Sequence, residues 1–253
     1  MSVVRKYNHL KDPEDPRDYL FKVSKPIPIP ESFTLQNLPE ILDQGQLGSC
    51  CANELSNALK FLLTKEHQTV FQPSRLFIYY FARKIDNSDT NQDTGITIRG
   101  GMKSIATYGV CWENTWPYDI TKFTIKPSQA AITASLPRAK NFQYHSVPQN
   151  LLSIQQALLS GFPIVIGIQV YDSFESAEVA KTGIVPMPVS TESNLGGHCV
   201  CIIGFNNATK IFKLMNSWGK LWGQQGMFTL PYNYVLDPKL ADSFWVASYF
   251  TGN

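Results

Sequence analysis

The sequence predicts an α+β protein with a helical first lobe, a β-rich second lobe and a cleft between them. Two segments of the first half, residues 50–65 and 73–84, carry apolar residues at helical spacing. The second half instead contains short apolar runs of strand type between residues 163 and 230. Helices that pack against a sheet are a common architecture, and the junction of two lobes is a frequent place for a binding site.

The composition is that of an ordinary globular protein, and it excludes several functional classes. The 253 residues include 22 basic and 20 acidic ones, which leaves a formal net charge of +2. No run of Lys and Arg alternates with aromatic residues, so we expect no nucleic-acid partner. No stretch of about 18 apolar residues is present, so we expect no membrane span. The oligomeric state is not predicted.

The cysteines and the first residues indicate a location. Five cysteines, of which Cys50 and Cys51 are adjacent, do not resemble a disulfide framework. The N-terminal residues lack the apolar core of a secretory signal. We therefore expect an intracellular, cytoplasmic protein in a reducing setting, not exported by a classical signal.

Residues 1–28 form a polar arm that several prolines interrupt. Such a segment cannot bury a core of its own. Its apolar residues Tyr19, Leu20 and Phe21 are suited to docking on the rest of the chain. Two interpretations stay open, a tail that clamps onto the body and a lid or short propeptide over a cleft.

The segment 50–65 predicts a helix that begins at a cysteine. Gly48 and Ser49 favour a turn and a helix start, which places Cys50 at the N-terminus of the helix. Unpaired backbone N–H groups and the positive end of the helix dipole lower the pKa of a thiol there. Cys50 is therefore a candidate nucleophile, although most free cysteines are inert packing residues.

The remaining elements follow in chain order. The pattern predicts a helix over 73–84, a surface loop over 86–93 and a third helix near 102–108, within a helical lobe of about 40–125. The β lobe, about 126–253, contains a helix over 151–160 and strands whose ranges are 163–170, 198–205, 211–216 and 226–230.

The loop after Phe205 predicts a hairpin that brings polar residues together. If Phe205 faces Ile211, then His198, Asn216 and Trp218 share one face of the sheet. His198 and Asn216 then lie within reach of a hydrogen bond, and Trp218 can shield that bond from water. A slip of one residue would destroy this arrangement.

A cysteine nucleophile needs a base, and the base needs a partner that orients its ring. His198 and Asn216 fit these two roles, against the alternative of a histidine that is merely packed. The other histidines, His9, His67 and His145, lie in predicted loops or at a helix end, without an amide partner at hairpin distance.

Several motifs resemble the papain-like cysteine peptidases, in the order that the family has them. Residues 44–50 look like the family's glutamine-to-cysteine signature, and residues 197–198 are similar to its histidine motif. Residues 216–219 resemble its asparagine motif, while residues 99–101 and 116–118 match landmarks in between. The resemblance covers residues 29–253 almost completely and implies a papain-like fold with the site between the two lobes.

The resemblance also implies the catalytic roles. Cys50 is the nucleophile, His198 the base and acid, and Asn216 the residue that orients the imidazole. Gln44 donates its side-chain amide to the oxyanion, and the backbone N–H of Cys50 is a second donor. This implies an endopeptidase that acts on peptide or protein substrates through a thioester and needs no metal or organic cofactor.

One residue beside the expected nucleophile departs from the family. Cys51 stands where the family usually has tryptophan, which leaves one side of the site less filled. Relatives without a signal sequence occur in bacteria and in large DNA viruses, so a packaged virus particle is a second possible location.

The resemblance further implies a substrate-binding set that is small or apolar. We expect an apolar side chain two residues before the cut on this basis. The expected substrate-binding residues are Gly100, Gly101, Met102, Ile166, Gly197, Cys199 and Trp218.

Three alternatives remain. Cys199 and Cys201 beside His198 could bind a metal, but both sulfurs face away from the histidine and lack the usual ligand spacing, so we expect no metal site. A catalytically silent binding protein would keep the cleft, and the unusual Cys51 is its only support. An acyl transferase or ligase would use the same residues and pass the acyl group to an amine.

Overall fold

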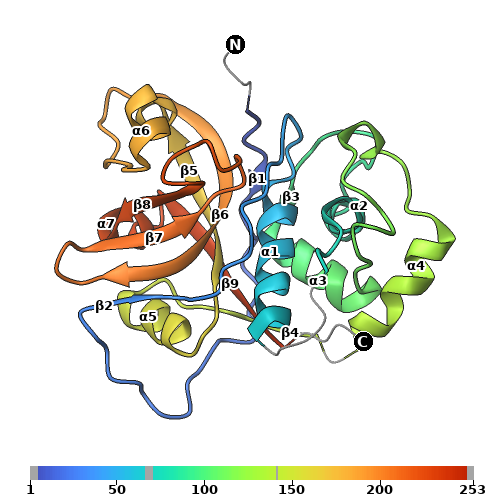
Figure 1. Cartoon of the computed structure of the whole chain (residues 1–253), viewed down its shortest axis with the longest axis horizontal. Helices are drawn as coiled ribbons and strands as arrows, with labels where there is room; N and C mark the ends of the chain where they lie inside the picture. Colours follow the sequence, from blue (N-terminus) through green and yellow to red (C-terminus); the bar gives the residue numbers. More distant parts are fainter. Residues whose placement is uncertain (1–4, 66–70, 141, 250–253) are drawn as a thin grey trace.

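The computed structural model describes residues 5–65, 71–140 and 142–249. It has a helical lobe and a β lobe, which stand side by side in Figure 1. The α+β prediction is confirmed. The helical lobe consists of α1 (Cys50–Lys65), α2 (Arg75–Ile85), α3 (Ile98–Tyr108), η1 (Ile120–Lys122), α4 (Gln129–Ser135) and η2 (Leu136–Ala139).

The predicted helices form because each buries an apolar face and has a defined start. α1 has the bounds that the sequence predicts. α2 begins after Ser74, whose hydroxyl accepts the N–H of Phe77. α3 begins earlier than predicted because Thr97 caps it in the same way through Gly100. The element α4 lies with the helices in Figure 1, and η2 follows it directly in the chain.

The β lobe is built on one antiparallel sheet of seven described strands, in the order β4-β9-β5-β6-β7-β8, with β2 paired to β6. The strands are β2 (Ser32–Thr34), β4 (Gln143–Ser146), β5 (Ile164–Tyr171), β6 (Asn194–Asn206), β7 (Ile211–Met215), β8 (Met227–Pro231) and β9 (Ala241–Tyr249). The helical elements of this lobe are α5 (Leu151–Leu159), η3 (Asp172–Glu175), α6 (Ala177–Thr182) and α7 (Tyr232–Leu236).

The hairpin of β6 and β7 differs from the prediction at its loop and agrees with it at the site. Next to the loop, Asn206 rather than Phe205 faces Ile211. The register then shifts between Ile202 and Gly204, and beyond the shift Cys201 faces Met215, as the predicted register requires. A β-bulge adds one residue to one strand and so changes the face of everything beyond it. This bulge brings His198 to the face expected for it.

The N-terminal arm lies between the two lobes. Its residues His9–Leu10 form β1, which pairs in parallel with β3 (Ile96–Thr97) of the helical lobe. The preceding residue, Asn8, forms a parallel β-bridge with Gly197, which lies next to His198 in β6. In Figure 1, β1 runs along the junction between α1 and β6.

The rest of the arm docks on the body. The N–H of Phe21 donates to the carbonyl of Ser146 at 2.8 Å, and the N–H of Ser146 donates to the carbonyl of Tyr19 at 2.9 Å. The ring of Phe21 packs edge-on against Phe162. The arm therefore contains both a part that covers the junction and a part that clamps onto the surface.

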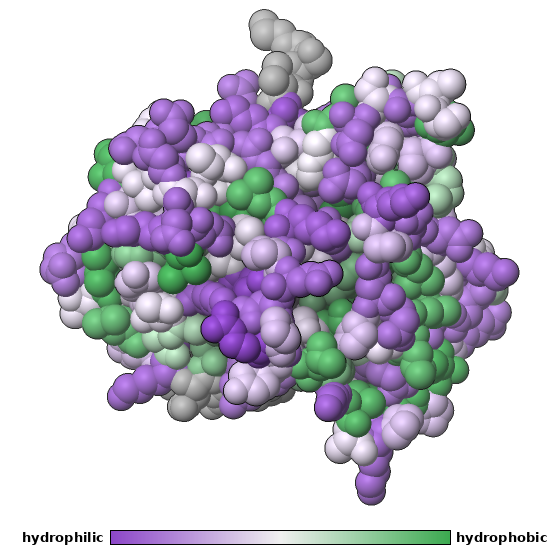
Figure 2. Space-filling view, turned by 180° about the vertical axis from the view of Figure 1, so that it is seen from behind, coloured by the Kyte–Doolittle hydropathy of each residue, from purple (hydrophilic) through white to green (hydrophobic). Residues whose placement is uncertain are grey.

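The surface has no large continuous apolar area on the face shown in Figure 2, where hydrophobic residues form separate small patches among hydrophilic ones. Within residues 5–65, 71–140 and 142–249, no helix is both long and apolar enough to cross a membrane. His67 lies outside the described residues.

Candidate active site

His198 is fixed by a hydrogen bond to Asn216. Its Nε2 lies 2.8 Å from Oδ1 of Asn216, and both residues are buried. The N–H of Ser217 also donates to this Oδ1 at 2.8 Å, which identifies it as the acceptor end of the amide. Nε2 must therefore carry the proton, and Nδ1 of the neutral ring presents its lone pair. The hydrogen bond predicted from the hairpin is confirmed.

Aromatic rings enclose this pair. Trp218 stacks on the imidazole of His198 with ring centroids 4.8 Å apart and planes inclined by 26°. Tyr7 of the arm meets both rings edge-on at 6.1 Å. The predicted shielding by Trp218 is thus present, and a residue of the arm adds a second cover.

Cys50 is the first residue of α1 and is fully buried. At this position the backbone N–H has no partner inside the helix. Contact with Cys51 and burial raise the pKa of the Cys50 thiol well above its usual value, and the hydrogen bond with His198 offsets them only in part. The pKa lowering expected from the helix terminus is therefore wrong for this state, because the covered thiol is desolvated.

His198 directs its free nitrogen to this thiol. Nδ1 of His198 is buried and makes no hydrogen bond to a nitrogen or oxygen of the described residues. The side-chain interaction with His198 is the one that lowers the pKa of Cys50. A ring held by Asn216 on one side and open to a thiol on the other is arranged to take the thiol proton.

Gln44 joins the loop before α1 to the strand end that holds Asn216. Its backbone N–H donates to the carbonyl of Ser217 at 2.9 Å, and its Oε1 accepts from the hydroxyl of Ser217 at 2.8 Å. Its Nε2 donates to the carbonyl of Leu47 at 3.0 Å. An amide nitrogen carries two protons, so one N–H of Gln44 remains for a further acceptor.

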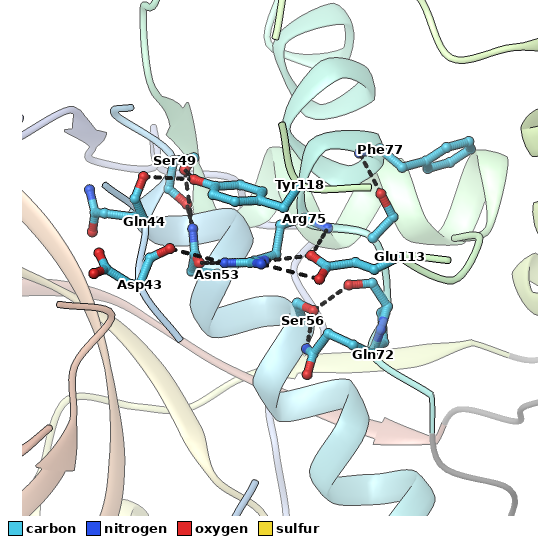
Figure 3. A network of polar contacts seen from close by, with 12 residues as sticks. Asp43, Gln44, Ser49, Asn53, Ser56, Gln72, Arg75, Phe77, Glu113 and Tyr118 are labelled. Atoms are coloured by element: carbon cyan, nitrogen blue, oxygen red, sulfur yellow. Dashed lines mark hydrogen bonds and ion pairs between the residues drawn. The ribbon is translucent and has the colours of Figure 1, made fainter. Parts of the chain in front are cut away.

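A buried polar network holds this loop in place (Figure 3). Arg75 forms an ion pair with Glu113 and donates to the carbonyl of Asp43 and to Oδ1 of Asn53, both at 3.1 Å. The hydroxyl of Tyr118 lies 2.5 Å from the Ser49 hydroxyl and donates to the Gln44 carbonyl at 2.9 Å.

The two halves of this network are themselves joined, because the guanidinium of Arg75 stacks on Tyr118 at 3.7 Å. Tyr118 belongs to a segment that the sequence marks only as a family landmark. The network fixes Gln44 and the start of α1 relative to α2.

The arm crosses the site through contacts with both lobes. Arg5 forms an ion pair with Glu175 at 3.0 Å and lies 4.0 Å above the ring of Trp218. On the other side, Lys6 forms an ion pair with Asp93 at 2.7 Å. The chain passes so close to Gly95 that a Cβ there would lie 1.7 Å from the carbonyl oxygen of Asn8.

The structure brings two of the expected substrate-binding residues, Gly197 and Trp218, to the arm, and a third, Cys199, follows His198 in β6. A Cβ on Gly197 would lie 2.6 Å from the carbonyl oxygen of His9, and Trp218 contacts Arg5 and Tyr7. Cys199 is buried in β6 opposite Gly167. Burial raises the pKa of its thiol to about 12.

The other four lie elsewhere. Gly100 and Gly101 are in the first turn of α3, where an added Cβ would meet Asp86 and Leu55 respectively. Met102 is buried in the same helix. Ile166 pairs with Val200, so it points to the sheet face opposite that of Gly167 and Cys199.

Two residues at the site were not expected from the sequence, His9 and Asp242. Nε2 of His9 lies 2.9 Å from Oδ1 of Asp242, and its Nδ1 lies 3.4 Å from Sγ of Cys51. The imidazole thus occupies space beside the residue where the family usually has tryptophan. His9 lies in a strand of two residues and Asp242 in an unpredicted strand, so only the tertiary structure pairs them.

The cysteines near the site form no metal-ligand cluster. Among the described residues, no group of three or more His, Cys, Asp and Glu side chains is placed to hold a metal ion. All five cysteines are free and buried.

This geometry of a buried cysteine at a helix start and a histidine–asparagine pair on a facing sheet agrees with a family assignment. The profile described as papain family cysteine protease matches residues 29–241. The chain therefore belongs to the papain family of cysteine proteases and is a cysteine-type peptidase.

Individual proteins support the assignment. The chain is 43% identical over 272 residues to an uncharacterized peptidase C1-like protein of Acanthamoeba polyphaga mimivirus, covering 97% of this chain and 87% of that protein. Procathepsin L of Mus musculus is 25% identical over 88% of this chain and 66% of its own length.

Solved structures agree. Xylellain, a cysteine protease from Xylella fastidiosa, superposes with a TM-score of 0.87 at 32% identity over 95% of each chain. Procathepsin L 3 of Tenebrio molitor shares the fold, with a TM-score of 0.72 at 19% identity over 92% of this chain and 75% of its own. The predicted papain-like two-lobed fold is confirmed.

Proposed function

We propose that the chain is an endopeptidase whose catalytic residues are Cys50, His198, Asn216 and Gln44. The observation that carries this proposal is the state of His198. Its Nε2 is committed to Asn216 at 2.8 Å, while its buried Nδ1 has no nitrogen or oxygen partner among the described residues and acts on the Cys50 thiol. The ring therefore has one orienting bond and one nitrogen free for proton transfer.

The reaction follows from these positions. Nδ1 of His198 accepts the thiol proton, and the Cys50 thiolate attacks the carbonyl carbon of the peptide bond. The free N–H of Gln44 and the backbone N–H of Cys50 donate to the oxyanion, where one such donor contributes roughly 2.7–4 kcal/mol. The imidazolium then protonates the leaving amine, which leaves a thioester on Cys50. Water, deprotonated by His198, releases the acid and restores the thiol.

The arm has to leave the site before this reaction can occur. Tyr7 covers His198 and Trp218, and contact with Cys51 together with burial holds the Cys50 thiol in its neutral form. We therefore propose that residues 5–10 act as a lid and that residues 11–28 anchor it. We also propose a preference for an apolar side chain two residues before the cut, on the basis of Met102, Ile166, Gly197 and Cys199.

The location proposed from the sequence is a reducing, intracellular setting or a packaged particle. All five cysteines being free thiols favours a reducing setting, and a relative from a virus makes the second location reasonable.

The test is labelling by a thiol-reactive epoxide together with hydrolysis of a fluorogenic peptide. We expect wild type to be labelled on Cys50 and to release the fluorophore, and Cys50→Ala to do neither. Cys111→Ala is the matched control, because Cys111 is also a buried free thiol but lies in the loop after α3. It should retain both properties.

Other outcomes separate the alternatives. Labelling of Cys50 without turnover of any peptide would indicate a binding protein that keeps the cleft. Products in which an added amine replaces water would indicate an acyl transferase or ligase. Gln44→Ala should lower kcat by about a hundredfold or more and leave labelling detectable.

A further inference from the structure

Glu54 is a buried acid close to the proposed nucleophile. It lies in α1 one turn after Cys50, and residues four apart in a helix occupy the same face. Glu54 is 1% exposed, and neither of its side-chain oxygens makes a hydrogen bond among the described residues. Such a group destabilises the fold unless it gains a partner in the working protein.

The surroundings of Glu54 keep its carboxyl neutral. Burial raises the pKa of the carboxyl well above its usual value, and the side chain of Ser217 offsets this only in part. From β6, the thiols of Cys199 and Cys201 interact with Glu54, and burial raises the pKa of both thiols, so they too are neutral. Within the described part of the chain, no cation acts on Glu54. The carboxyl therefore retains its proton and can donate it in a hydrogen bond.

Ser217, the polar residue that acts on Glu54, connects two of the proposed catalytic residues. Its hydroxyl donates to Oε1 of Gln44 at 2.8 Å, and its backbone N–H donates to Oδ1 of Asn216 at 2.8 Å. Since Nε2 of Gln44 donates to the carbonyl of Leu47 at 3.0 Å, Oε1 is the acceptor end of that amide. The single hydroxyl proton of Ser217 is thus committed to Gln44, while its oxygen can still accept a hydrogen bond.

We propose that Glu54 is a positioning residue for the oxyanion donor Gln44, and that its neutral carboxyl donates a hydrogen bond to the hydroxyl oxygen of Ser217 in the working site. The proposal rests on the proposed peptidase function. The chain of bonds then runs from Glu54 through Ser217 to the amide oxygen of Gln44, and each bond polarises the next. A polarised amide is the stronger N–H donor to the oxyanion. An ionised Glu54 would instead accept the Ser217 proton and leave Gln44 without this partner.

Three variants of the full-length chain separate donation from packing. Glu54→Gln keeps a donor on a side chain of the same length, whereas Glu54→Leu keeps an apolar side chain of similar size and removes the donor. Asn57→Leu is the matched control, because Asn57 is also a buried polar residue of α1 with an unpartnered oxygen, but its amide donates to the carbonyl of Glu40. The values of kcat and KM are measured with one fluorogenic peptide, and the active sites are counted with the epoxide label.

We expect Glu54→Gln and Asn57→Leu to retain kcat within about twofold, and Glu54→Leu to lower it by about fivefold with little change in KM, as for the loss of one hydrogen bond. When Ser217→Ala is already present, Glu54→Leu should have almost no further effect, since the chain of bonds is broken. Equal kcat values for Glu54→Gln and Glu54→Leu, or a loss from Glu54→Leu that does not depend on Ser217, overturn the proposal and leave the peptidase function standing.

A second measurement needs no turnover. Infrared spectra at neutral pH should contain the C=O stretch of a protonated carboxylic acid that Glu54→Gln lacks, and Ser217→Ala should shift this band, because the acid loses its acceptor. Identical spectra for wild type and Glu54→Gln, or a band that ignores Ser217, contradict the proposal. If the band behaves as expected but neither wild type nor any variant cleaves a peptide or reacts at Cys50, the peptidase function fails and the positioning role is withdrawn with it.

Discussion

The two parts of the arm are held in different ways. Residues 5–10 reach both lobes through charged side chains at the site, such as Lys6 on Asp93 and Arg5 on Glu175. Residues 11–28 dock on the body around Arg99, whose guanidinium binds the carbonyl of Pro13 and the carboxylate of Asp18. The first part is the proposed lid, and the second part is its proposed anchor.

The two parts of the arm also differ in the pKa values of two buried carboxylates, which are shifted in opposite directions. Burial acts to raise the pKa of Asp242, which contacts residues 5–10 through His9, but the pKa is lowered because the interactions with His9, Ser243 and Lys11 together outweigh burial. The pKa of Asp12, in the anchoring part, is raised by burial, and its hydrogen bonds to Trp245 and to the N–H of Arg99 do not outweigh this. Acid therefore acts in opposite directions on the two parts. We therefore expect the proposed lid to open in acid while the proposed anchor stays attached.

The largest effect should come from the anchor. Arg99→Ala removes the partner of Asp18 and the donor to Pro13, and it should lower the free energy of unfolding by about 3 kcal/mol, measured by urea denaturation. Arg17→Ala is the control, because Arg17 is exposed and contacts only Asp15 among the described polar partners. It should change stability by less than about 0.5 kcal/mol. Equal losses in both variants would remove the distinction between the two parts.

A smaller effect should come from residues 5–10, and it should appear in the reactivity of Cys50 rather than in the stability of the protein. Tyr7→Ala removes the ring that covers His198 and Trp218, so labelling of Cys50 should become about tenfold faster, a difference of about 1.4 kcal/mol. The Tm should change little. Tyr19→Ala, at an arm tyrosine that is 79% exposed, should leave the labelling rate unchanged. If both tyrosine variants label alike, Tyr7 is not a cover.

The smallest effect should appear in acid. The contribution of Asp242 is present above its unfolded pKa of about 3.9 and is lost as the pH falls through the lower folded value. The contribution of Asp12 has the opposite sign, since it is present at low pH and is lost as the pH rises through its raised folded pKa.

Hydrogen exchange, corrected for the intrinsic rate, can follow both parts. Protection of residues 8–10 should fall by about threefold below pH 4, while that of residues 19–21 should persist. In Asp242→Asn the protection of residues 8–10 should be low at every pH. Loss of protection in both parts at the same pH would show that the arm leaves as one unit.

The catalytic side of the site could be predicted from the sequence to a large extent. The amphipathic pattern after Cys50 fixed the bounds of α1, and the alternation around His198 and Asn216 predicted their shared face. The register at the loop was wrong, and the bulge between Ile202 and Gly204 compensated for it. A bulge has no simple sequence pattern, so this part of the agreement was not derivable.

The course of the arm and the contacts of His9 could not be predicted, for physical reasons. β1 has only two residues and forms because β3 and Gly197 offer backbone partners from distant parts of the chain. An added Cβ on Gly100 or Gly101 would meet Asp86 or Leu55, whereas one on Gly95 would meet the arm at Asn8. Local patterns do not distinguish these two uses of glycine.

The contact between His9 and Gly167 is sensitive to single-base mutations. The missing side chain of Gly167 leaves room for the imidazole of His9 against β5, since a Cβ would lie 1.9 Å from the ring. Every single-base change in a glycine codon that substitutes another residue adds at least that one carbon. We expect any such change to displace the imidazole, so one nucleotide would remove the proposed lid from the site without altering a proposed catalytic residue.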